Sequence, residues 1–297
     1  MQVSNREVRV SQGIVRVARL DADMYQFLSD PEPVIAELRA RRLGIDLFSF
    51  TQTITETTPK YRYPMEWENQ AVLPVSTFEE WWEKQIRFKA RNKARQAEKK
   101  GVVVREVPFG EELVRGICEV YNETPLRQGR PFRHFGKDFA TIYKEEATYL
   151  EHSTFIGAFV GDELVGFIKM VTDEQRIQAG LMNFISKIRH RDKAPANALL
   201  AQAVRSCEAR GISHVVYSYF AYGRRERDNL TDFKERNGFK RVDFPRYYVP
   251  LSAWGNVAFR MGLHHRVVDR LPESLGEKLR EMRAKWYIRR EPVAKEA

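Results

Sequence analysis

The sequence predicts an α+β fold in which a mixed sheet is flanked by helices. From residue 102 onward, the apolar patterns follow one another in the order β-α-α-β-β-β-α-β-α-β. The three consecutive strands of this series are Thr154–Val160, Glu163–Thr172 and Arg176–Ser186, and the Gly161-Asp162 pair between the first two is a hairpin signal. Three antiparallel strands before an α-β-α-β half favour an α+β plan. The chain of 297 residues is 43% hydrophobic and 30% charged, which suffices for a sizeable core.

Residues 1–76 are expected to form an N-terminal β/α extension or a partial domain, and the sequence leaves open which of the two. Apolar and polar residues alternate on both sides of Ser11-Gln12-Gly13, which predicts a short hairpin. Val34, Ile35 and Leu38 have helical spacing. The elements expected after the hairpin are a helix over 31–42 that Gly44 ends, a strand over 45–51, and a loop-like stretch over 53–70.

A long helix is expected to begin the main domain, which we place at residues 77–250. Thr77 and Glu80 have the spacing of a capping box, and Gly101 ends the helix. The apolar residues between them keep a helical period: Phe78, Trp82, Ile86, Ala90, Ala94 and Ala97. Besides the three-stranded meander, the domain should contain strands over 102–107, 213–219 and 239–249 and helices over 110–121, 136–150, 196–210 and 230–236.

Residues 251–297 form a C-terminal tail that is expected to be helical between Leu251 and Arg290. One face of this helix is apolar: Leu275, Leu279, Met282 and Trp286. Basic residues flank that face: Arg280, Arg283, Lys285, Arg289 and Arg290. We expect the apolar face to pack onto the main domain, and attachment to an anionic membrane surface is the alternative.

The net charge of +10 and the isoelectric point of about 9.5 make anionic partners plausible, although solubility alone explains such a charge equally well. Cys118 and Cys207 lie in apolar helical surroundings, which indicates buried free thiols in a reducing compartment. No apolar signal core begins the sequence and no run of about 18 apolar residues occurs, so we expect a cytoplasmic protein.

No metal site is expected from the spacing of cysteine and histidine. The six histidines show no ligand spacing apart from the adjacent pair His264 and His265. Adjacent side chains do not share one face of a helix, so we do not expect this pair to converge on a metal ion.

The segment from Arg191 to Leu200 is the strongest candidate site. It follows the strand that ends at Ser186 and begins the helix expected from Ala196. A helix N-terminus presents free backbone N–H groups and the positive end of the helix dipole to anything that lies in the turn. Arg191, Lys193 and the first amides of the helix would then bind a pyrophosphate or an RNA phosphate. The alternative is structural, because Pro195 is a favourable first residue for any helix.

This segment resembles the pyrophosphate loop of the GNAT superfamily of N-acyltransferases, whose motif is Arg/Gln-x-x-Gly-x-Gly/Ala. Arg191 matches the first position and Ala196 the last, while Ala194 stands where the middle glycine should be. The order of elements over about residues 78–250 is also that of the GNAT fold. The resemblance implies that Arg191, Lys193, Ala194, Ala196 and Asn197 hold the donor's phosphates, with acyl-CoA as co-substrate.

Three segments are more similar to one branch, the Fem-type aminoacyltransferases, than to small acetyltransferases. They are the basic run over 91–105, the Pro-Ala-Asn-Ala-Leu-Leu run over 195–200, and the Leu-Thr-Asp-Phe-Lys-Glu-Arg-Asn-Gly-Phe run over 230–239. In that branch an aminoacyl-tRNA replaces acyl-CoA as donor. The lysine aligned with Lys234 sits at the substrate site there, where an ammonium could stabilise a carbonyl oxyanion. The alternative for Lys234 is an exposed side chain on a short helix.

In GNAT-like proteins the connection between the first two helices borders the acceptor pocket, and residues 121–134 occupy that position here. Glu123 could serve as the base for an acceptor amine if burial raised its pKa. Arg127 and Arg130 could bind an acceptor carboxylate in bidentate fashion. The alternative is a loop held by caps and surface ion pairs.

GNAT enzymes often use a tyrosine on the following short helix as general acid, and this chain has Phe233 at the matching place. Tyr219 and Tyr222 are the candidates to take over that role, and the alternative for both is a place in the aromatic core or at its rim. The meander strand is also expected to splay from its neighbour between Gln178 and Asn183. That strand carries no carboxylate, so any base on it would act through water.

The helix expected from Thr77 has a cationic face on which Arg87, Arg91 and Arg95 recur every four residues. Such a face could contact the phosphates of RNA, or it could simply be solvated.

Taken together, these patterns predict an N-acyltransferase that moves an acyl or aminoacyl group to a primary amine. The donor would be acyl-CoA or aminoacyl-tRNA. A non-catalytic module of the same fold that binds RNA or another anionic partner is the alternative.

Overall fold

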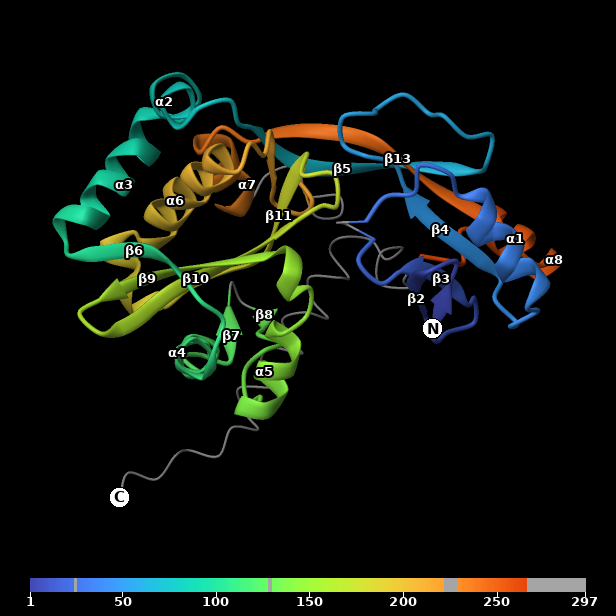
Figure 1. The fold of residues 1–297 in the computed structure, drawn as a ribbon, viewed down its shortest axis with the longest axis horizontal. Helices are drawn as coiled ribbons and strands as arrows, with labels where there is room; N and C mark the ends of the chain where they lie inside the picture. The colour runs from blue at the N-terminus through green and yellow to red at the C-terminus, as the bar shows by residue number, and fades with distance from the viewer. Residues whose placement is uncertain (24–25, 128–129, 222–228, 266–297) are drawn as a thin grey trace.

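The protein is described by a computed structural model over residues 1–23, 26–127, 130–221 and 229–265. Within these residues eleven strands form one sheet in the order β1-β2-β3-β4-β13-β5-β12-β11-β10-β9-β6 (Figure 1). A separate two-stranded ribbon consists of β7 (Leu126–Arg127) and β8 (Arg130–Pro131). The fold is therefore α+β with one large mixed sheet, as the sequence predicts.

One half of the sheet carries the predicted series of elements. Its strands are β6 (Val102–Val107), β9 (Ser153–Val160), β10 (Glu163–Thr172), β11 (Gln178–Ser186) and β12 (His214–Val216). The first four pair antiparallel, whereas β12 runs parallel to β11 because α6 (Pro195–Ala209) connects the two strands. The element order expected from residue 102 onward is confirmed.

Helices cover both faces of this half (Figure 1). On one face, α3 (Phe88–Lys99) and α6 pack on a core that includes Ile156 and Ile168. On the other face, α4 (Glu111–Tyr121) and α5 (Phe139–Glu146) pack on a core that includes Phe155 and Phe167. Neighbouring residues of one strand thus enter opposite cores, because successive side chains of a strand point to opposite faces.

The other half contains the N-terminal residues. Its elements are β1 (Gln2–Val3), β2 (Arg6–Val10), β3 (Val17–Leu20), α1 (Glu32–Ala40), β4 (Leu47–Thr51) and α8 (Ala253–Arg260). The predicted hairpin is confirmed by the antiparallel pairing of β2 with β3. These N-terminal strands extend the same sheet, and together with α1 they enclose an apolar cluster of their own around Ile35 and Phe50.

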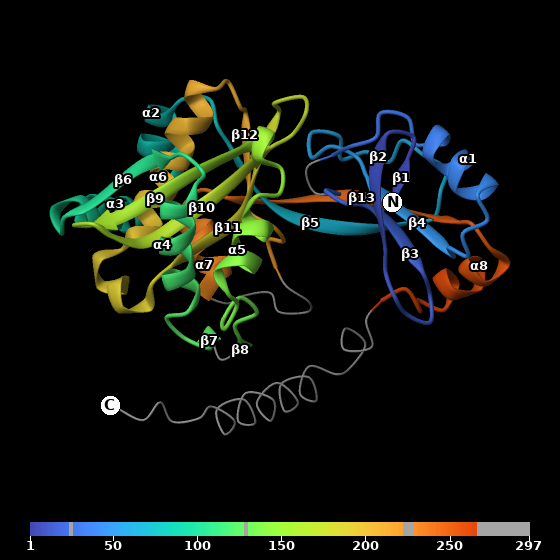
Figure 2. The same cartoon turned by 60° about the horizontal axis from the view of Figure 1, so that its bottom comes forward.

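Two long strands join the halves: β5 (Met65–Pro74) and β13 (Lys240–Pro250) (Figure 2). They pair with each other from Val72↔Lys240 to Met65↔Tyr247. The prediction of a loop over 53–70 is therefore wrong from residue 65 onward. The first half of β5 has no apolar period, because its glutamates form ion pairs with Arg246, His264 and His265 instead of entering a core.

The single long helix expected from Thr77 is wrong. Thr77 does cap a helix, since its hydroxyl accepts the N–H of Glu80 at 3.0 Å. However, α2 (Phe78–Glu80) continues as a π-helical turn (Trp81–Gln85), and the chain is extended at Ile86 before α3 begins. The cause is tertiary: the buried Trp81 indole donates to the carbonyl of Asn237 at 2.9 Å, and the N–H of Arg87 donates to Arg236 at 2.8 Å.

Several boundaries differ from the expected ones. The helix expected over 136–150 is limited to α5, and a short 3₁₀ turn (Leu150–His152) follows it. The strand expected over 213–219 ends at Val216. Of the helical tail, α8 is described, whereas Leu275, Leu279, Met282, Trp286 and the basic residues beside them lie outside the described residues.

Both cysteines are free thiols, with Cys207 buried and Cys118 half-buried. Among the described residues, no helix combines the length and apolar character that crossing a bilayer requires.

Candidate functional site

The splay expected between Gln178 and Asn183 is present from Leu181 onward, whereas the first three residues of that stretch are paired. β11 and β12 share three residue pairs, from Gln178↔His214 to Gly180↔Val216. Beyond them the chain leaves β11 and follows β5: the N–H of Tyr217 donates to Ala71 and the N–H of Ala71 donates to Ser218, each at 2.8 Å. The edge of β11 that faces β12 is therefore not paired with that strand from residue 181 onward. An extended ligand could add hydrogen bonds to this edge.

Aromatic rings line the splay. The ring of Phe184 on β11 lies 5.2 Å from that of Tyr217 and 5.8 Å from that of Phe233 on α7 (Asn229–Arg236). Phe233 is half-buried among these rings and has no hydroxyl to donate.

Lys234 lies fully buried next to these aromatic rings. Its Nζ donates to the carbonyl of Tyr219 and lies 4.9 Å from the centre of the Tyr217 ring. The alternative of an exposed lysine is therefore wrong. A buried ammonium beside the end of β12 places positive charge in a site of low dielectric constant, where its field is strong.

The loop that precedes α6 contains a left-handed residue at the glycine position of the motif. Ala194, which stands at the glycine position, has a φ of 54° and a ψ of 43° in the left-handed region. Glycine adopts this conformation readily, whereas for other residues the conformation costs about 1–2 kcal/mol. The unfavourable conformation is kept at the position where the family uses glycine.

The first amides of α6 are partly free. Pro195 has no N–H, and the N–H of Asn197 donates to the carbonyl of Ala194 at 3.2 Å. Within the described part of the chain, the N–H of Ala196 donates to no acceptor. Arg191 is exposed and Lys193 is half-buried on the preceding 3₁₀ turn (Ile188–Lys193). One free amide and two cations are therefore available to an anion.

Contacts with α3 and α7 hold this loop in place. Lys100 donates to the carboxylate of Asp192 at 2.9 Å and to its carbonyl at 3.1 Å. The side-chain amide of Asn197 donates to that of Asn237 at 3.3 Å, so this predicted ligand is tied to the end of α7.

Glu123 supports the same loop from the other side. Its carboxylate accepts the N–H groups of Ile188 at 2.6 Å and Arg189 at 2.9 Å, and a guanidinium N–H of Arg127 at 3.3 Å. It therefore caps the 3₁₀ turn that carries Arg191. Because three donors already occupy this carboxylate, the arrangement fits a positioning role better than that of a free base.

Arg127 and Arg130 differ in solvent exposure. Arg127 is half-buried and donates to the carbonyls of Ser186 at 2.8 Å and Val120 at 3.2 Å. Burial lowers its pKa, although the nearby carboxylate of Glu123 acts against this shift. Arg130 on β8 is exposed. Arg127 thus ties the connection to the end of β11.

A buried polar cluster beside β11 was not predicted. The carboxylate of Glu146 on α5 accepts the hydroxyl of Tyr121 at 2.7 Å and the side-chain amide of Asn183 at 2.9 and 3.0 Å. The Nζ of Lys169 donates to the carbonyl of Glu146 at 2.8 Å and to the hydroxyl of Thr148 at 3.1 Å. We call Tyr121, Glu146, Lys169 and Asn183 the Glu146 cluster.

Burial shifts the titration of this cluster. It raises the pKa of Glu146, although Tyr121, Lys169 and Asn183 act in the opposite direction. Burial also lowers the pKa of Lys169 to about 8, against the pull of Glu146. Carboxylates with raised pKa values next to a specific charged partner are typical of catalytic sites, and structural networks show them as well.

One signal in the sequence pointed to this cluster. Lys169 is the single charged residue within the apolar run from Leu164 to Val171. A lysine at such a position has to find a partner inside the fold. Glu146, in contrast, belongs to an ordinary helical pattern and carries no signal of its own.

Tyr219 faces the junction of the two halves. Its hydroxyl donates to the carboxylate of Glu68 at 3.2 Å, and burial together with that carboxylate raises its pKa to about 12. Glu68 in turn lies 2.8 Å from the guanidinium of the buried Arg246. Tyr222, the other tyrosine considered for the role of general acid, lies outside the described residues.

The predicted cationic face of α3 is partly neutralised. Arg91 pairs with Glu83 at 2.9 Å, and the guanidinium of Arg95 lies 5.6 Å from the centre of a Trp82 ring. Arg87 precedes α3 and is exposed.

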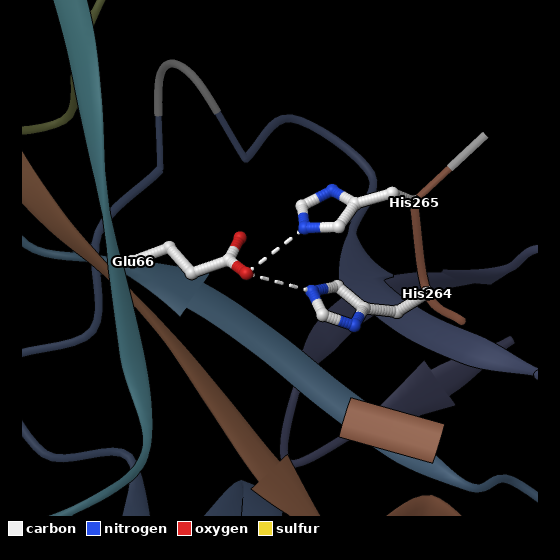
Figure 3. Close-up of side chains that lie close together, drawn as sticks. All are labelled: Glu66, His264 and His265. Atoms are coloured by element: carbon white, nitrogen blue, oxygen red, sulfur yellow. Dashed lines mark hydrogen bonds and ion pairs between the residues drawn. The ribbon is translucent and has the colours of Figure 1, made fainter. Parts of the chain in front are cut away.

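His264 and His265 do converge, contrary to the argument from adjacency. They follow the end of α8, outside any helix, and both imidazoles lie next to the carboxylate of Glu66 (Figure 3).

Comparisons with known proteins place the fold. No family model matches the sequence, and no curated protein matches it either.

Among solved structures, the C-terminal domain of a protein described as a lysylphosphatidylglycerol synthetase from Agrobacterium fabrum is similar with a TM-score of 0.57, at 14% identity over 88% of this chain and 86% of that one. The L-PGS of Bacillus licheniformis has a TM-score of 0.56, at 15% identity over 81% of this chain and 80% of that one. FemX is similar with a TM-score of 0.48, at 12% identity over 79% and 72%. The likeness to the first two structures shows the fold of this chain, and its order of elements from β6 onward is the GNAT-like one.

Proposed function

We propose that this protein is an acyltransferase that moves an acyl or aminoacyl group from an activated donor to a primary amine. The observation that carries the proposal is the position of Glu146, a buried carboxylate bonded to Asn183 on β11, beyond the last pair between β11 and β12. The acyl arm of a donor would lie in the splay, along β11. The carboxylate then flanks the strand that would hold the reacting carbonyl.

The donor's phosphates would lie at the start of α6. The N–H of Ala196 and the side chains of Arg191 and Lys193 supply the donors, and both acyl-CoA and the 3′ end of aminoacyl-tRNA supply phosphate. The Cβ of Ala194 limits how closely a phosphate approaches. Glu123 acts here as a positioning residue, because it caps the turn that carries Arg191.

In the proposed reaction, the amine nitrogen attacks the acyl carbonyl and Glu146 accepts a proton from the amine. The new C–N bond forms first and gives a tetrahedral intermediate, which then collapses as the bond between the carbonyl carbon and the donor's sulfur or ribose oxygen breaks. The buried ammonium of Lys234 stabilises the oxyanion of the tetrahedral intermediate. Tyr219 is the candidate proton donor for the leaving group, because a phenol carries its proton at neutral pH and a hydroxyl can donate.

The acceptor is the less defined partner. Arg130, exposed on β8, is available to an acceptor carboxylate, whereas Arg127 is already bound to carbonyls. The description of the similar Agrobacterium fabrum structure names a lysylphosphatidylglycerol synthetase. Vesicles that contain phosphatidylglycerol, which offers hydroxyl groups and no amine, therefore enter the panel as the contrast to free and peptidic amines, and transfer to the lipid alone would contradict the proposed amine acceptor.

The test is a transfer assay with radiolabelled acyl-CoA and with labelled aminoacyl-tRNA, each against the acceptor panel. We expect label in a product with one of the donors, and a lower apparent donor affinity in Arg191→Gln. The matched control is Arg39→Gln, which removes an exposed arginine from α1 in the other half.

Absence of transfer with both donors would overturn the proposal. If the same protein bound RNA with a steep dependence on salt, Arg87, Arg91 and Arg95 would become the candidate contacts, and the non-catalytic module would be the better reading.

A further inference from the structure

The cluster of Glu66, His264 and His265 lies outside the proposed transfer site. Glu66 is on β5, and the two histidines follow α8, which ends at Arg260. One potential ligand atom from each residue lies within 4.8 Å of the others. Figure 3 shows the two imidazole rings reaching the same carboxylate from neighbouring positions of the backbone.

The distances suit a common metal ion. The Nε2 atoms of His264 and His265 lie 3.1 and 2.9 Å from the same oxygen of Glu66. Ligands at about 2.0–2.1 Å from a tetrahedral Zn²⁺ lie about 3.3 Å from one another. The two distances from Glu66 are therefore within a few tenths of an ångström of that spacing, and the two histidine nitrogens lie within 4.8 Å of each other.

Packing fixes one ligand and leaves the others accessible. The side chain of His264 is 1% exposed, and its ring lies 4.9 Å from that of Phe259 and 4.5 Å from that of Tyr248. His265 and Glu66 are 42% and 34% exposed, so solvent reaches the triad from their side. A metal ion bound here would keep an open position for water or another ligand.

The donor set selects the kind of metal. Two imidazoles and one carboxylate suit Zn²⁺ and similar transition metals, whereas Mg²⁺ and Ca²⁺ prefer oxygen ligands alone. We propose that Glu66, His264 and His265 form a Zn²⁺ site that fastens the segment after α8 to β5. Because β5 joins the two halves of the sheet, the ion would link the C-terminal segment to the strand that holds the halves together.

The test uses the full-length protein after removal of metal with a chelator. Isothermal titration with ZnCl₂ should give about one bound ion per chain, and Co²⁺ should give the intense d–d absorption of a tetrahedral site with nitrogen ligands. Zinc should also raise the melting temperature, because a ligand that binds only the folded state stabilises it.

His265→Ala is the informative variant, because its exposed side chain can be removed without opening the core. We expect His265→Ala and Glu66→Gln to weaken zinc binding by roughly 100-fold and to abolish the thermal shift, since each removes one of three ligands. His152→Ala, which removes an exposed histidine elsewhere, should bind zinc as the unaltered protein does. Equal affinity in His265→Ala and the unaltered protein, or no stoichiometric binding at all, would overturn the site.

Discussion

The carboxylate of Glu146 accepts two contacts, at 2.9 and 3.0 Å, from the side-chain amide of Asn183, a residue 37 positions further along the chain. The contact joins the end of α5 to the strand that borders the splay. It also fixes the orientation of the carboxylate before a substrate binds. A general base has to be held in this way to accept a proton efficiently.

Glu146→Gln should lower the rate constant of transfer by at least about 100-fold, because the amide keeps the shape of the side chain and cannot accept the proton of the amine. The pKa of Glu146 is raised by burial, so transfer by the unaltered protein should fall as the pH drops and the carboxyl is protonated. The Gln variant should lose that acidic limb. Single-turnover assays across pH measure both effects. Glu145→Gln, which alters an ion pair with Lys137 at the surface of α5, is the control, and an unchanged rate in Glu146→Gln would remove Glu146 from the mechanism.

Lys169→Met should change how stability depends on pH. Burial lowers the pKa of Lys169 from 10.5 to about 8. Between these two pKa values the unfolded chain binds more protons than the folded one. Lys169 therefore makes the free energy of unfolding increase as the pH rises through this window, by at most about 3 kcal/mol. The Met variant should lack this gain. Urea unfolding at several pH values tests it, with the exposed Lys93→Met as control. Parallel pH profiles for Lys169→Met and the unaltered protein would contradict the expectation.

Ala194→Gly should leave stability unchanged or raise it by up to about 1 kcal/mol, because glycine relieves the left-handed backbone while it adds freedom to the unfolded chain. Ala201→Gly, within α6, should instead lower it by about 1 kcal/mol. Thermal unfolding compares the two variants. Ala194→Gly should also bind CoA or pyrophosphate more tightly if the donor lies at this turn. A loss of stability equal to that of Ala201→Gly would show that the turn is not strained.

Trp81→Phe should lower the free energy of unfolding by about 2–4 kcal/mol. It removes a hydrogen bond from a fully buried indole and leaves the carbonyl of Asn237 without that donor. Trp254 offers a matched control, since its indole also donates to a backbone carbonyl, that of Ile14, but is 43% exposed. Trp254→Phe should cost less than about 1 kcal/mol. Equal losses in denaturant titrations would show that burial does not decide the energy of this bond.

Local patterns were enough to predict the elements of the GNAT-like half. The meander from Ser153 to Ser186 alternates or is continuously apolar, and its turn is marked by glycine, so its three strands were evident. The splay was expected only through the family resemblance, whereas the anion site before α6 was also expected from the free amides of a helix N-terminus. The left-handed form of Ala194 then agrees with the glycine that the motif requires.

The features that could not be predicted from the sequence depend on contacts with residues far along the chain. β5 has glutamates at alternating positions in its first half, and their partners are more than 170 residues away. The break at Ile86 depends on bonds to Arg236 and Asn237. Glu146 differs from its exposed neighbours only through its burial against Tyr121 and Asn183. None of these contacts leaves a period or a motif in the sequence.

The position of β5 in the middle of the sheet has a consequence for synthesis on the ribosome. Residues 71–73 of this strand are buried and apolar, yet their partners lie at residues 215–218, in β12 and the segment just after it, and at residues 240–241 of β13. About 140 residues must therefore be translated before the first partner strand exists, and an uncovered apolar strand of this kind invites association with other chains. Nascent chains arrested before residue 214 should be clients of ribosome-associated chaperones, and chains released beyond residue 250 should not.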